Sequence, residues 1–597
     1  MLMKDYKPQH NTFSNLWFAF LCHFKAAPCY SVYLLLQSVL GDLITLFEHV
    51  FLPAHIISCV ERKAPISEVL IFLFPIASAV ILKVSLTHIV GNYIAPKSNM
   101  KINKYIHLAL YEKAVSMDIA KYDDSKYYND YVWAMEYSPW HLDQAVNQSR
   151  QFISNIIVAL VSGSYVVSVD IKALIALLAV AAINLTANII LNKIDMKQWE
   201  ELMPVWRKRN YSNRVFYLSY FVKDLRMGKM NERLEKDFSE CRDVINGTSD
   251  RYFKKFLPFE LLNYPLHDIV LKGVYLSYLF YQSFVKKLYG FGMLYGIYNA
   301  VRNINDKINN SMRIFPDLQW NSKNIDKIRV FLDAKNKILD NGTSEISNSG
   351  DIELENVHFT YPGNDTPTIN GISMNIKQGE KIALVGFNGA GKSTLIKLIL
   401  RLYDVSDGVI KFDGKPIDDY PLQKYRNVYS TLFQDFQTIA ATVGQNITMD
   451  NSELDAQKAH KSLEMADFKQ KFDTLPKGFE TQLTKEFDND GVNLSGGEAQ
   501  KLALARVLYA NKNIIILDEP SSALDPLAEY QLNKTVTELA VEKTVIIISH
   551  RLSTTRFVDK IYMLENGRVV ESGNHDALLK QNGKYAEMFK LQAEKYR

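Results

Sequence analysis

Long runs of apolar residues are confined to roughly the first 300 positions of the chain. The purest run, residues 173–191, carries no charged side chain and is about as long as the hydrocarbon core of a bilayer requires. Buried helices of a large water-soluble domain are the alternative, which this run disfavours. Less pure stretches lie at residues 28–52, 69–95, 152–169, 257–281 and 288–301. Together the stretches predict about six membrane-spanning helices, the last of them short and broken by glycine.

Polar connections between these stretches indicate the topology. Residues 96–151 and 193–256 are long, polar and rich in lysine and arginine, whereas other connections are short. Because basic loops stay on the cytoplasmic side, we expect both long connections, the N-terminus and the C-terminal half to be cytoplasmic. Charged residues also interrupt the apolar stretches, at Asp42, Glu48, Lys83, Asp268 and Lys272. Asp268 and Lys272 are four residues apart and can pair on a helix, and both pairing and cavity lining remain open.

Strand-like and helical patterns alternate in the second half of the chain. The apolar runs at residues 381–387, 513–519 and 544–550 have the length of buried strands. This alternation predicts an α/β domain with a largely parallel sheet. A polar stretch without apolar periodicity precedes it and is expected to be a linker. The predicted organisation is a transmembrane domain with long cytoplasmic helical extensions (1–339), the linker (340–350) and a soluble domain (351–597).

Composition narrows the classes of partner. The chain has 597 residues, too many for one core, and its 69 Lys+Arg nearly balance its 65 Asp+Glu, for a net charge of +4. No nucleic-acid partner is expected, because such a balance gives no broad basic field. The polar N-terminus lacks the pattern of a signal peptide. The cysteines are too widely spaced for a zinc site and show no pairing pattern, so we expect reduced or buried thiols at Cys22, Cys29, Cys59 and Cys241.

A glycine-rich sequence, GFNGAGKST, occupies residues 386–394, between a strand-like run and a helical pattern. Its glycines let the backbone turn tightly, so that N–H groups and a helix N-terminus face phosphate. Lys392 is expected to reach the β- and γ-phosphates, and Ser393 to hold Mg²⁺. The loop residues expected to bind the nucleotide are Gly386, Asn388, Gly389, Gly391, Lys392, Ser393 and Thr394.

Two acidic residues, Asp518 and Glu519, end a later strand-like run. Asp518 suits a magnesium shell, and Glu519 can polarise an attacking water. The pair follows LSGGE (494–498) by the length of a helix and precedes SSALD (521–525) and IIISH (546–550). This order of motifs, over about residues 355–590, resembles the ATPase domain of ABC transporters, which has an ATP-binding sheet core and a helical subdomain.

The resemblance implies further roles in the ATP site. Tyr361 matches the aromatic residue that stacks on adenine. Gln434 matches the glutamine that touches Mg²⁺ and the attacking water, and His550 matches the switch histidine that contacts the γ-phosphate. The implied catalytic residues are therefore Glu519, His550 and Gln434, and the implied metal ligands are Ser393, Gln434 and Asp518.

The resemblance also identifies a second loop, which in this family contacts the ATP bound by a partner domain. Ser495, Gly496 and Gly497 match the signature loop, which in this family closes on the γ-phosphate held by another ATPase domain. Asp525 matches the acid of the D-loop. Glu498 stands where the family usually has glutamine, and we expect this difference to be tolerated. A chain with both loops implies a dimer, formed with a second copy or with a related half-transporter.

The membrane half resembles the exporter type of the family, in which each chain joins about six spans to one ATPase domain. Residues 120–138 resemble the region of the first coupling helix, which docks on the ATPase domain, and residues 213–234 match the second more loosely. The implied fold is a multidomain membrane protein, with an all-α transmembrane domain and a C-terminal P-loop α/β ATPase domain.

The implied function is ATP-driven export by a dimer that uses ATP and Mg²⁺ and alternates access across a bacterial cell membrane. The expected cargo is a peptide or an amphipathic small molecule. The alternatives are a lipid or multidrug exporter, and an ATP-gated channel or regulatory protein. Intact Glu519 and His550 favour a pump, because a gate can tolerate a dead site.

Overall fold

The computed structural model describes residues 8–218, 221–450, 452–520, 529–531, 534–535, 543–549 and 554–594. Within these ranges, the side chains of 125–126, 129–130, 173–174, 176–177, 262–268, 554 and 593–594 are not described. The chain divides into two compact units. The helical unit comprises Met1–Ser116 and Asn129–Ala334, and the sheet unit comprises Met117–Tyr128 and Lys335–Arg597.

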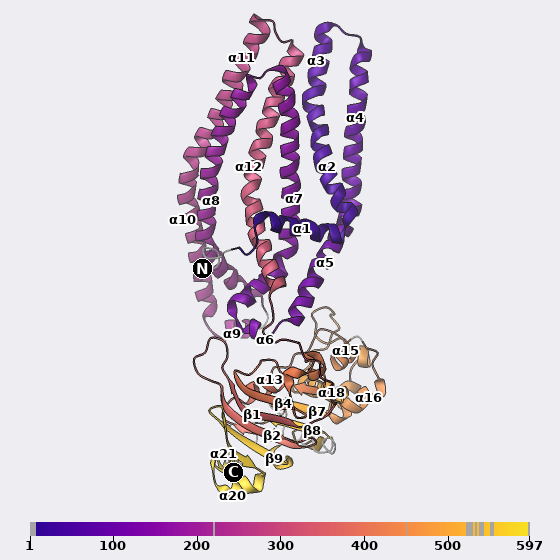
Figure 1. The fold of residues 1–597 in the computed structure, drawn as a ribbon, viewed down its shortest axis with the longest axis vertical. Coiled ribbons are helices and arrows are strands. Elements are labelled where there is room, and N and C mark those ends of the chain that lie inside the picture. The colour runs from indigo at the N-terminus through magenta and orange to yellow at the C-terminus, as the bar shows by residue number, and fades with distance from the viewer. Residues whose placement is uncertain are drawn as a thin grey trace. The chain divides into compact units, whose positions relative to one another are not determined.

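Long helices build the helical unit and run alongside one another, several of them continuing through π-helical turns (Figure 1). The first hairpin and the helices before it are α1 (Thr12–Ala26), α2 (Pro28–Leu46), η1 (Phe47–Phe51), α3 (Leu52–Arg62), α4 (Ile66–Ile89), η2 (Val90–Ile94) and α5 (Ala95–Ser116). The remaining ones are α7 (Ser125–Val169), α8 (Ala173–Tyr217), α9 (Val222–Met227), α10 (Met230–Asp268), η4 (Ile269–Tyr275), α11 (Leu276–Phe280), η5 (Tyr281–Val285) and α12 (Phe291–Asp333).

Helices with the length and composition of membrane spans recur in this unit. Among the described residues, four qualify, and Ile269–Val285 is apolar but shorter. The four are Pro28–Arg62, Ile66–Ser116, Tyr131–Val169 and Leu178–Tyr217. Within α4 no residue is buried, and its side chains Ile71, Phe74 and Ile81 are exposed, as a lipid-facing helix requires. The predicted all-α transmembrane region with several apolar helices is confirmed.

The last predicted span, residues 288–301, begins the long helix α12, which is not among the apolar spans. Leu294, Ile297 and Val301 of α12 are buried in the core of the helical unit. A Cβ atom at Gly292 would lie 2.5 Å from the Ala54 carbonyl oxygen, so α12 and α3 meet backbone to backbone. Because protein covers α12 here, this stretch needs less apolar surface than a helix that faces lipid.

Two of the charges inside the apolar stretches, Asp42 and Lys83, have partners on other helices. The Asp42 carboxylate accepts hydrogen bonds from Lys307 Nζ of α12 at 2.8 Å and from Ser154 Oγ of α7 at 2.7 Å. Lys83 Nζ donates to Thr45 Oγ1 at 2.6 Å. Such pairing offsets the cost of a charge near the bilayer. The choice between pairing and cavity lining for Asp268 and Lys272 lies outside the described side chains, because that of Asp268 is not described.

Two sheets form the framework of the sheet unit. The smaller has the strand order β2-β1-β4-β5, and the larger has the order β10-β9-β3-β8-β7-β6. The strands are β1 (Ile352–Phe359), β2 (Ile369–Ile376), β3 (Lys381–Gly386), β4 (Asp407–Phe412), β5 (Lys415–Pro416), β6 (Tyr429–Leu432), β7 (Ile514–Asp518), β8 (Thr544–Ile548), β9 (Lys560–Glu565) and β10 (Arg568–Gly573).

Helices accompany both sheets (Figure 1). They are α6 (Ile119–Asp123), α13 (Lys392–Ile399), η6 (Ile417–Asp419), α14 (Leu422–Arg426), α15 (Val443–Thr448), α16 (Ala456–Met465), α17 (Lys469–Asp473), η7 (Gly478–Glu480), α18 (Gly496–Ala510), η8 (Thr554–Phe557), α20 (His575–Gln581) and α21 (Lys584–Glu594). Alternate residues of β3 enter two apolar cores, with Leu384 in one and Val385 in the other. Two-sided burial explains why β3, β7 and β8 are continuous apolar runs.

Parallel pairing joins β9, β3, β8, β7 and β6, as the sequence predicts. The register aligns Leu384 of β3 with Ile548 of β8, and Ile548 with Asp518 of β7. The carboxyl ends of these strands therefore lie at one edge of the sheet. The segments that follow β3, β6 and β7 all carry residues predicted for the ATP site.

A short upstream segment, Met117–Tyr128, belongs to the sheet unit. The Asp118 carboxylate accepts hydrogen bonds from the backbone N–H groups of Lys337, at 2.5 Å, and Ile338, at 3.2 Å. The Tyr403 hydroxyl donates to the carboxylate of Asp123, at the end of α6. This segment overlaps the region that resembles a first coupling helix. The sheet unit thus takes in part of the first long connection and resumes at Lys335, before the predicted linker.

Candidate active site

The glycine-rich loop joins the end of β3 to the start of α13. Gly386 has a φ of 151°, and a Cβ atom there would lie 2.3 Å from the Leu564 carbonyl oxygen of the neighbouring strand β9. Gly391, at the N-cap of α13, has a φ of 99°. Both positions need glycine, the first for close backbone approach and the second for its left-handed conformation.

A cavity of about 620 Å³ opens over this loop. It combines eight of the predicted site residues with Thr368 and Ala390. The predicted ones are Asn388, Gly389, Gly391, Lys392, Ser393, Thr394, Gln434 and Glu519. Its polar lining and its position at a helix N-terminus suit a phosphate chain.

Lys392 lies buried at the start of α13. Its Nζ donates hydrogen bonds to the carbonyl oxygens of Gly386, at 2.9 Å, and Phe387, at 3.1 Å. Burial lowers the pKa of the Lys392 ammonium, and the carboxylates of Glu519 and Asp518 oppose that shift. The side chain is therefore folded back over the loop, where its charge can meet a phosphate.

Asp518 and Ser393 fit a magnesium ion. Asp518 is only 5% exposed, and its Oδ1 atom is buried without a hydrogen-bond partner among the described residues. Burial raises the pKa of the Asp518 carboxyl to about 6, against the effect of a hydrogen bond with Ser393. A divalent cation would satisfy the buried oxygen and favour the ionised carboxylate.

Glu519 is held by groups from three segments. Its N–H donates to the Ile548 carbonyl of β8 at 3.0 Å, and its carbonyl accepts from Gln500 Nε2 at 3.2 Å. Its carboxylate accepts from Gln434 Nε2 at 3.1 Å. The φ of Glu519 is 51°, a left-handed conformation that costs a non-glycine residue about 1–3 kcal/mol. Strain of this kind is typical of residues fixed at a functional site.

Tyr361 lies beside the loop but does not line the cavity among the residues described. Its hydroxyl lies 3.1 Å from Thr394 Oγ1, and its ring meets those of Phe359 and Tyr403 edge-on, at centroid distances of 4.9 and 5.4 Å. Lys397 Nζ lies 5.9 Å from the Tyr361 centroid. The stacking of Tyr361 on adenine stays a prediction.

The signature loop caps its own helix. Ser495, the N-cap of α18, accepts a hydrogen bond from the Glu498 N–H at 3.3 Å, and Glu498 Oε2 accepts from the Ser495 N–H at 2.8 Å. Lys471 Nζ lies 3.1 Å from Glu498 Oε1. These donors, the Ser495 N–H first, hold the pKa of the Glu498 carboxyl below its usual value. Ser495 and Gly496 are exposed.

Two predicted site residues, Asp525 and His550, lie outside the described residues. Sequence reasoning missed other residues that the structure brings to the site. Gln500 supports Glu519, although it sits in the helical run after the signature loop. Thr368, just before β2, lines the cavity. Neither position carries a local signal in the sequence, because both reach the site only through the folding of distant segments.

The helical unit contains a second cavity, of about 440 Å³. Residues of α7, α8 and α12 line it, and the charged ones are Asp195, Arg313 and Asp317. Two indoles, Trp199 and Trp320, also line it, with ring centroids 6.1 Å apart. The cavity therefore combines aromatic surface with an excess of one negative charge.

Comparison with known proteins identifies the family that part of the sheet unit matches. Residues 369–522 match the family model described as "ABC transporter". The chain carries an ABC transporter ATPase domain. The predicted resemblance to ABC transporters is thereby confirmed, and the matched residues lie within the sheet unit.

The curated relatives are named as lipid A-core flippases and as a multidrug resistance protein. An ATP-dependent lipid A-core flippase of Photobacterium profundum is 37% identical over 258 residues, which cover 42% of this chain and 43% of the relative. The same-named protein of Saccharophagus degradans is 40% identical over 243 residues, 41% of each chain. Multidrug resistance protein pgp-1 of Caenorhabditis elegans is 38% identical over 252 residues, 42% of this chain and 19% of its own. The match spans less than half the length of each of these relatives.

The whole chain shares its fold with a solved ABC exporter. A bacterial Atm1-family ABC exporter with ATP bound superposes with a TM-score of 0.79 over 94% of this chain and 98% of its own, at 20% identity. The predicted fold class, helical transmembrane domain followed by ABC ATPase domain, is confirmed, and the chain is a multi-pass membrane protein.

The capping box around Glu498 generates a first prediction. Glu498→Gln should keep the cap, because the glutamine carbonyl can accept the same hydrogen bond from Ser495, and ATPase activity should change less than about twofold. Glu498→Ala should lower the free energy of unfolding by about 0.5–2 kcal/mol. Thermal unfolding of the purified protein measures this difference.

Lys471→Ala is the matched control for Glu498. It removes the ion pair but leaves the cap, so its cost should stay below about 1 kcal/mol. Equal destabilisation by Glu498→Gln and Glu498→Ala would show that the side chain does not act through the cap.

Proposed function

We propose that the protein is an ATP-driven exporter that works as a dimer in a bacterial cell membrane, with its N-terminus and ABC domain in the cytoplasm. The observation that carries the hydrolytic part is the meeting of Lys392, Asp518 and Glu519 at one sheet edge. An ABC domain with an intact acidic pair, on an exporter fold, suits a pump. The names of the relatives, lipid A flippases and a multidrug resistance protein, support cargo export.

Each residue of the site has a chemical role in the proposed reaction. The loop and Lys392 hold the phosphate chain, and Ser393, Gln434 and Asp518 would hold Mg²⁺, which neutralises charge developing on the phosphate. The Glu519 carboxylate accepts a proton from the attacking water. Gln434, hydrogen-bonded to Glu519, fixes the direction of that carboxylate. Tyr361 supports the adenine, and His550 contacts the γ-phosphate.

The second prediction tests Glu519. Glu519→Gln should keep ATP affinity within a few-fold, because the carboxylate does not bind phosphate, yet lower turnover roughly 10²–10⁴-fold. Hydrolysis at saturating Mg·ATP and binding of a fluorescent ATP analogue give the two values. Glu480→Gln, an exposed carboxylate of η7, is the matched control and should behave as the wild type. Normal turnover in Glu519→Gln would overturn the assignment.

The same variant separates a pump from a gated channel. Uptake of a fluorescent amphipath into inside-out vesicles should need ATP and vanish in Glu519→Gln. A channel gated by ATP would instead let the probe equilibrate when ATP binds without turnover. Equilibration in Glu519→Gln vesicles with ATP would favour the gate and reject the pump.

The position of the signature loop supports the proposed dimer. Ser495 and Gly496 are exposed, and the cavity over the phosphate loop includes neither of them among its described lining residues. A capped helix N-terminus on the surface suits a phosphate held by another chain. No feature of the described site is degenerate, so a homodimer can form two competent sites. A related half-transporter is the other possible partner.

The third prediction tests action in trans. Lys392→Ala and Ser495→Arg should each abolish ATPase activity, the first by losing a phosphate contact and the second by blocking closure. In a mixed dimer one site carries both changes and the other carries neither. Mixing the two inactive proteins should therefore restore part of the activity. Activity that stays at background argues against a signature loop acting in trans, and because one intact site cannot cycle alone when two sites are strictly coupled, a crosslink then tests the contact itself.

Crosslinking supplies the independent readout. Cysteines at Ser495 and Gly389 should join two chains when ATP is present and not when it is absent. The endogenous Cys29 is exposed and should be replaced in this background. Absence of the crosslink, together with failed complementation, would reject the proposed dimer.

The cavity of α7, α8 and α12 suggests the chemistry of the cargo. Asp195 follows the apolar run 173–191 and Asp317 follows the predicted span 288–301, so both carboxylates lie beyond the bilayer core, where charges can face water. Two carboxylates against one guanidinium, beside two indoles, suit an amphipathic molecule with a positive charge. A cationic peptide meets this description, although a peptide is a narrower class than the lipid and drug cargoes named for the relatives.

The fourth prediction concerns these carboxylates. The double variant Asp195→Asn, Asp317→Asn should lower ATP-dependent uptake of a cationic amphipathic dye about tenfold, while a neutral analogue changes little. The loss of attraction to the cation sets the difference. Asp243→Asn, an exposed carboxylate of α10, is the control and should leave both uptake rates unchanged. Equal loss for both dyes would point to a structural role.

A further inference from the structure

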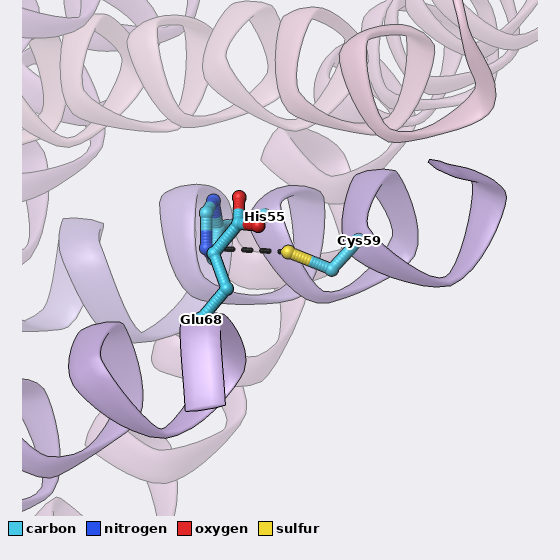
Figure 2. A group of neighbouring side chains, drawn as sticks. All are labelled: His55, Cys59 and Glu68. Carbon is cyan, nitrogen blue, oxygen red and sulfur yellow. Dashed lines mark hydrogen bonds between the residues drawn. The ribbon is translucent and has the colours of Figure 1, made fainter. Parts of the chain in front are cut away.

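Three side chains at the first helical hairpin converge outside the sites described above. His55 and Cys59 lie four residues apart on α3, and Glu68 lies in the first turn of α4. One ligand atom from each lies within 4.8 Å of the other two. Figure 2 shows the imidazole of His55 and the sulfur of Cys59 on one face of α3, with the Glu68 side chain reaching toward them.

The donor set is that of a borderline-soft transition metal. Imidazole nitrogen, thiolate sulfur and carboxylate oxygen are the three ligand types that Zn²⁺ takes in proteins. His55 Nε2 and Cys59 Sγ are 3.4 Å apart. Ordinary Zn–N and Zn–S bonds at a tetrahedral angle place these two atoms about 3.5 Å apart. The pair therefore already has the spacing that a shared ion requires.

The surroundings hold the ligands in place. Cys59 is 1% exposed, while His55 and Glu68 are half-buried. The His55 ring packs against Phe72 of α4, with centroids 4.5 Å apart. Ligands fixed by packing lose little freedom when an ion binds, and the partly open side leaves an entry path.

In the structure, the Arg62 guanidinium contacts two of these three side chains, Glu68 and Cys59. Its Nη2 atom donates to Glu68 Oε1 at 2.8 Å and lies 3.9 Å from Cys59 Sγ. The Arg62 side chain is 58% exposed, and an ion pair this exposed stabilises little. Arg62 can therefore swing into solvent and release Glu68 to a metal. A polar cluster that needs no metal is the rival explanation.

We propose that His55, Cys59 and Glu68 form a site for a Zn²⁺-class ion that ties α3 to α4. This proposal departs from the expectation that the wide cysteine spacing rules out a zinc site, because here one thiol combines with nitrogen and oxygen ligands. Binding releases the Cys59 thiol proton to solvent, and water takes the fourth position. Glu61, on the next turn, accepts a hydrogen bond from the Phe291 N–H at 2.9 Å, so the ion would brace α3 beside its contact with α12.

The fifth prediction is metal binding by the full-length protein in detergent. In a variant with Cys22, Cys29 and Cys241 replaced by serine, Co²⁺ should give a thiolate charge-transfer absorption that saturates at one ion per chain. Zn²⁺ should displace it. The absorption should vanish in Cys59→Ser, and the affinity should fall roughly tenfold or more in His55→Gln and in Glu68→Gln.

Two controls keep this proposal open to failure. A protein with Cys29 as its sole thiol should show no such absorption. Arg62→Gln removes the competing cation and should strengthen Co²⁺ binding, whereas a metal-free polar cluster predicts no binding in any variant. No absorption in the sole-Cys59 protein, or affinity unchanged by both His55→Gln and Glu68→Gln, would overturn the site.

Discussion

The parallel register of β3, β8 and β7 is the constraint on which the candidate active site depends. Leu384, Ile548 and Asp518 lie in one row across these strands, so the glycine-rich loop and the acidic pair leave the sheet at the same edge. The Glu519 N–H completes the row by donating to Ile548. Slipping one strand by a residue would turn Asp518 to the other face and separate it from Ser393.

Burial at this edge gives the site its electrostatic character. Lys392 and Asp518 are both nearly inaccessible to solvent. Burial lowers the pKa of the Lys392 ammonium and raises the pKa of the Asp518 carboxyl, which favours the neutral form of each. Two opposite charges held in such a place interact more strongly than they would in water. A phosphate and a divalent cation would relieve both groups at once, which links nucleotide and metal binding.

In the helical unit, the side chains of each helix depend on whether lipid or another helix lies against it. Where lipid faces a helix, as at α4, apolar side chains remain exposed. Where helices meet, glycine and paired charges replace bulk, as at Gly292 and in the Asp42–Lys307 pair. The hairpin of α3 and α4 also carries the three side chains of the proposed metal site, His55, Cys59 and Glu68.

The sequence could predict those features that depend on neighbouring residues. The phosphate loop, the acidic pair and the signature loop are local patterns, and the fold class follows from long apolar runs in the first half and short ones in the second. The sequence could not predict contacts between residues that are distant along the chain. Lys307 is not marked as the partner of Asp42, and nothing marks Tyr403 as the partner of Asp123. The span at 288–301 was harder because helix packing, rather than lipid, sets its composition.

The placement of Met117–Tyr128 within the sheet unit has a consequence for biosynthesis. Asp123 and Tyr403 are separated by 280 residues, so at about 5–20 residues per second roughly 15–60 s of translation divides them. During that interval the segment Met117–Tyr128 has left the ribosome, while its partner Tyr403 has not yet been made. The sheet unit therefore cannot complete its fold around Asp123 until the segment that carries Tyr403 has been made, so its assembly spans the synthesis of the helices between them.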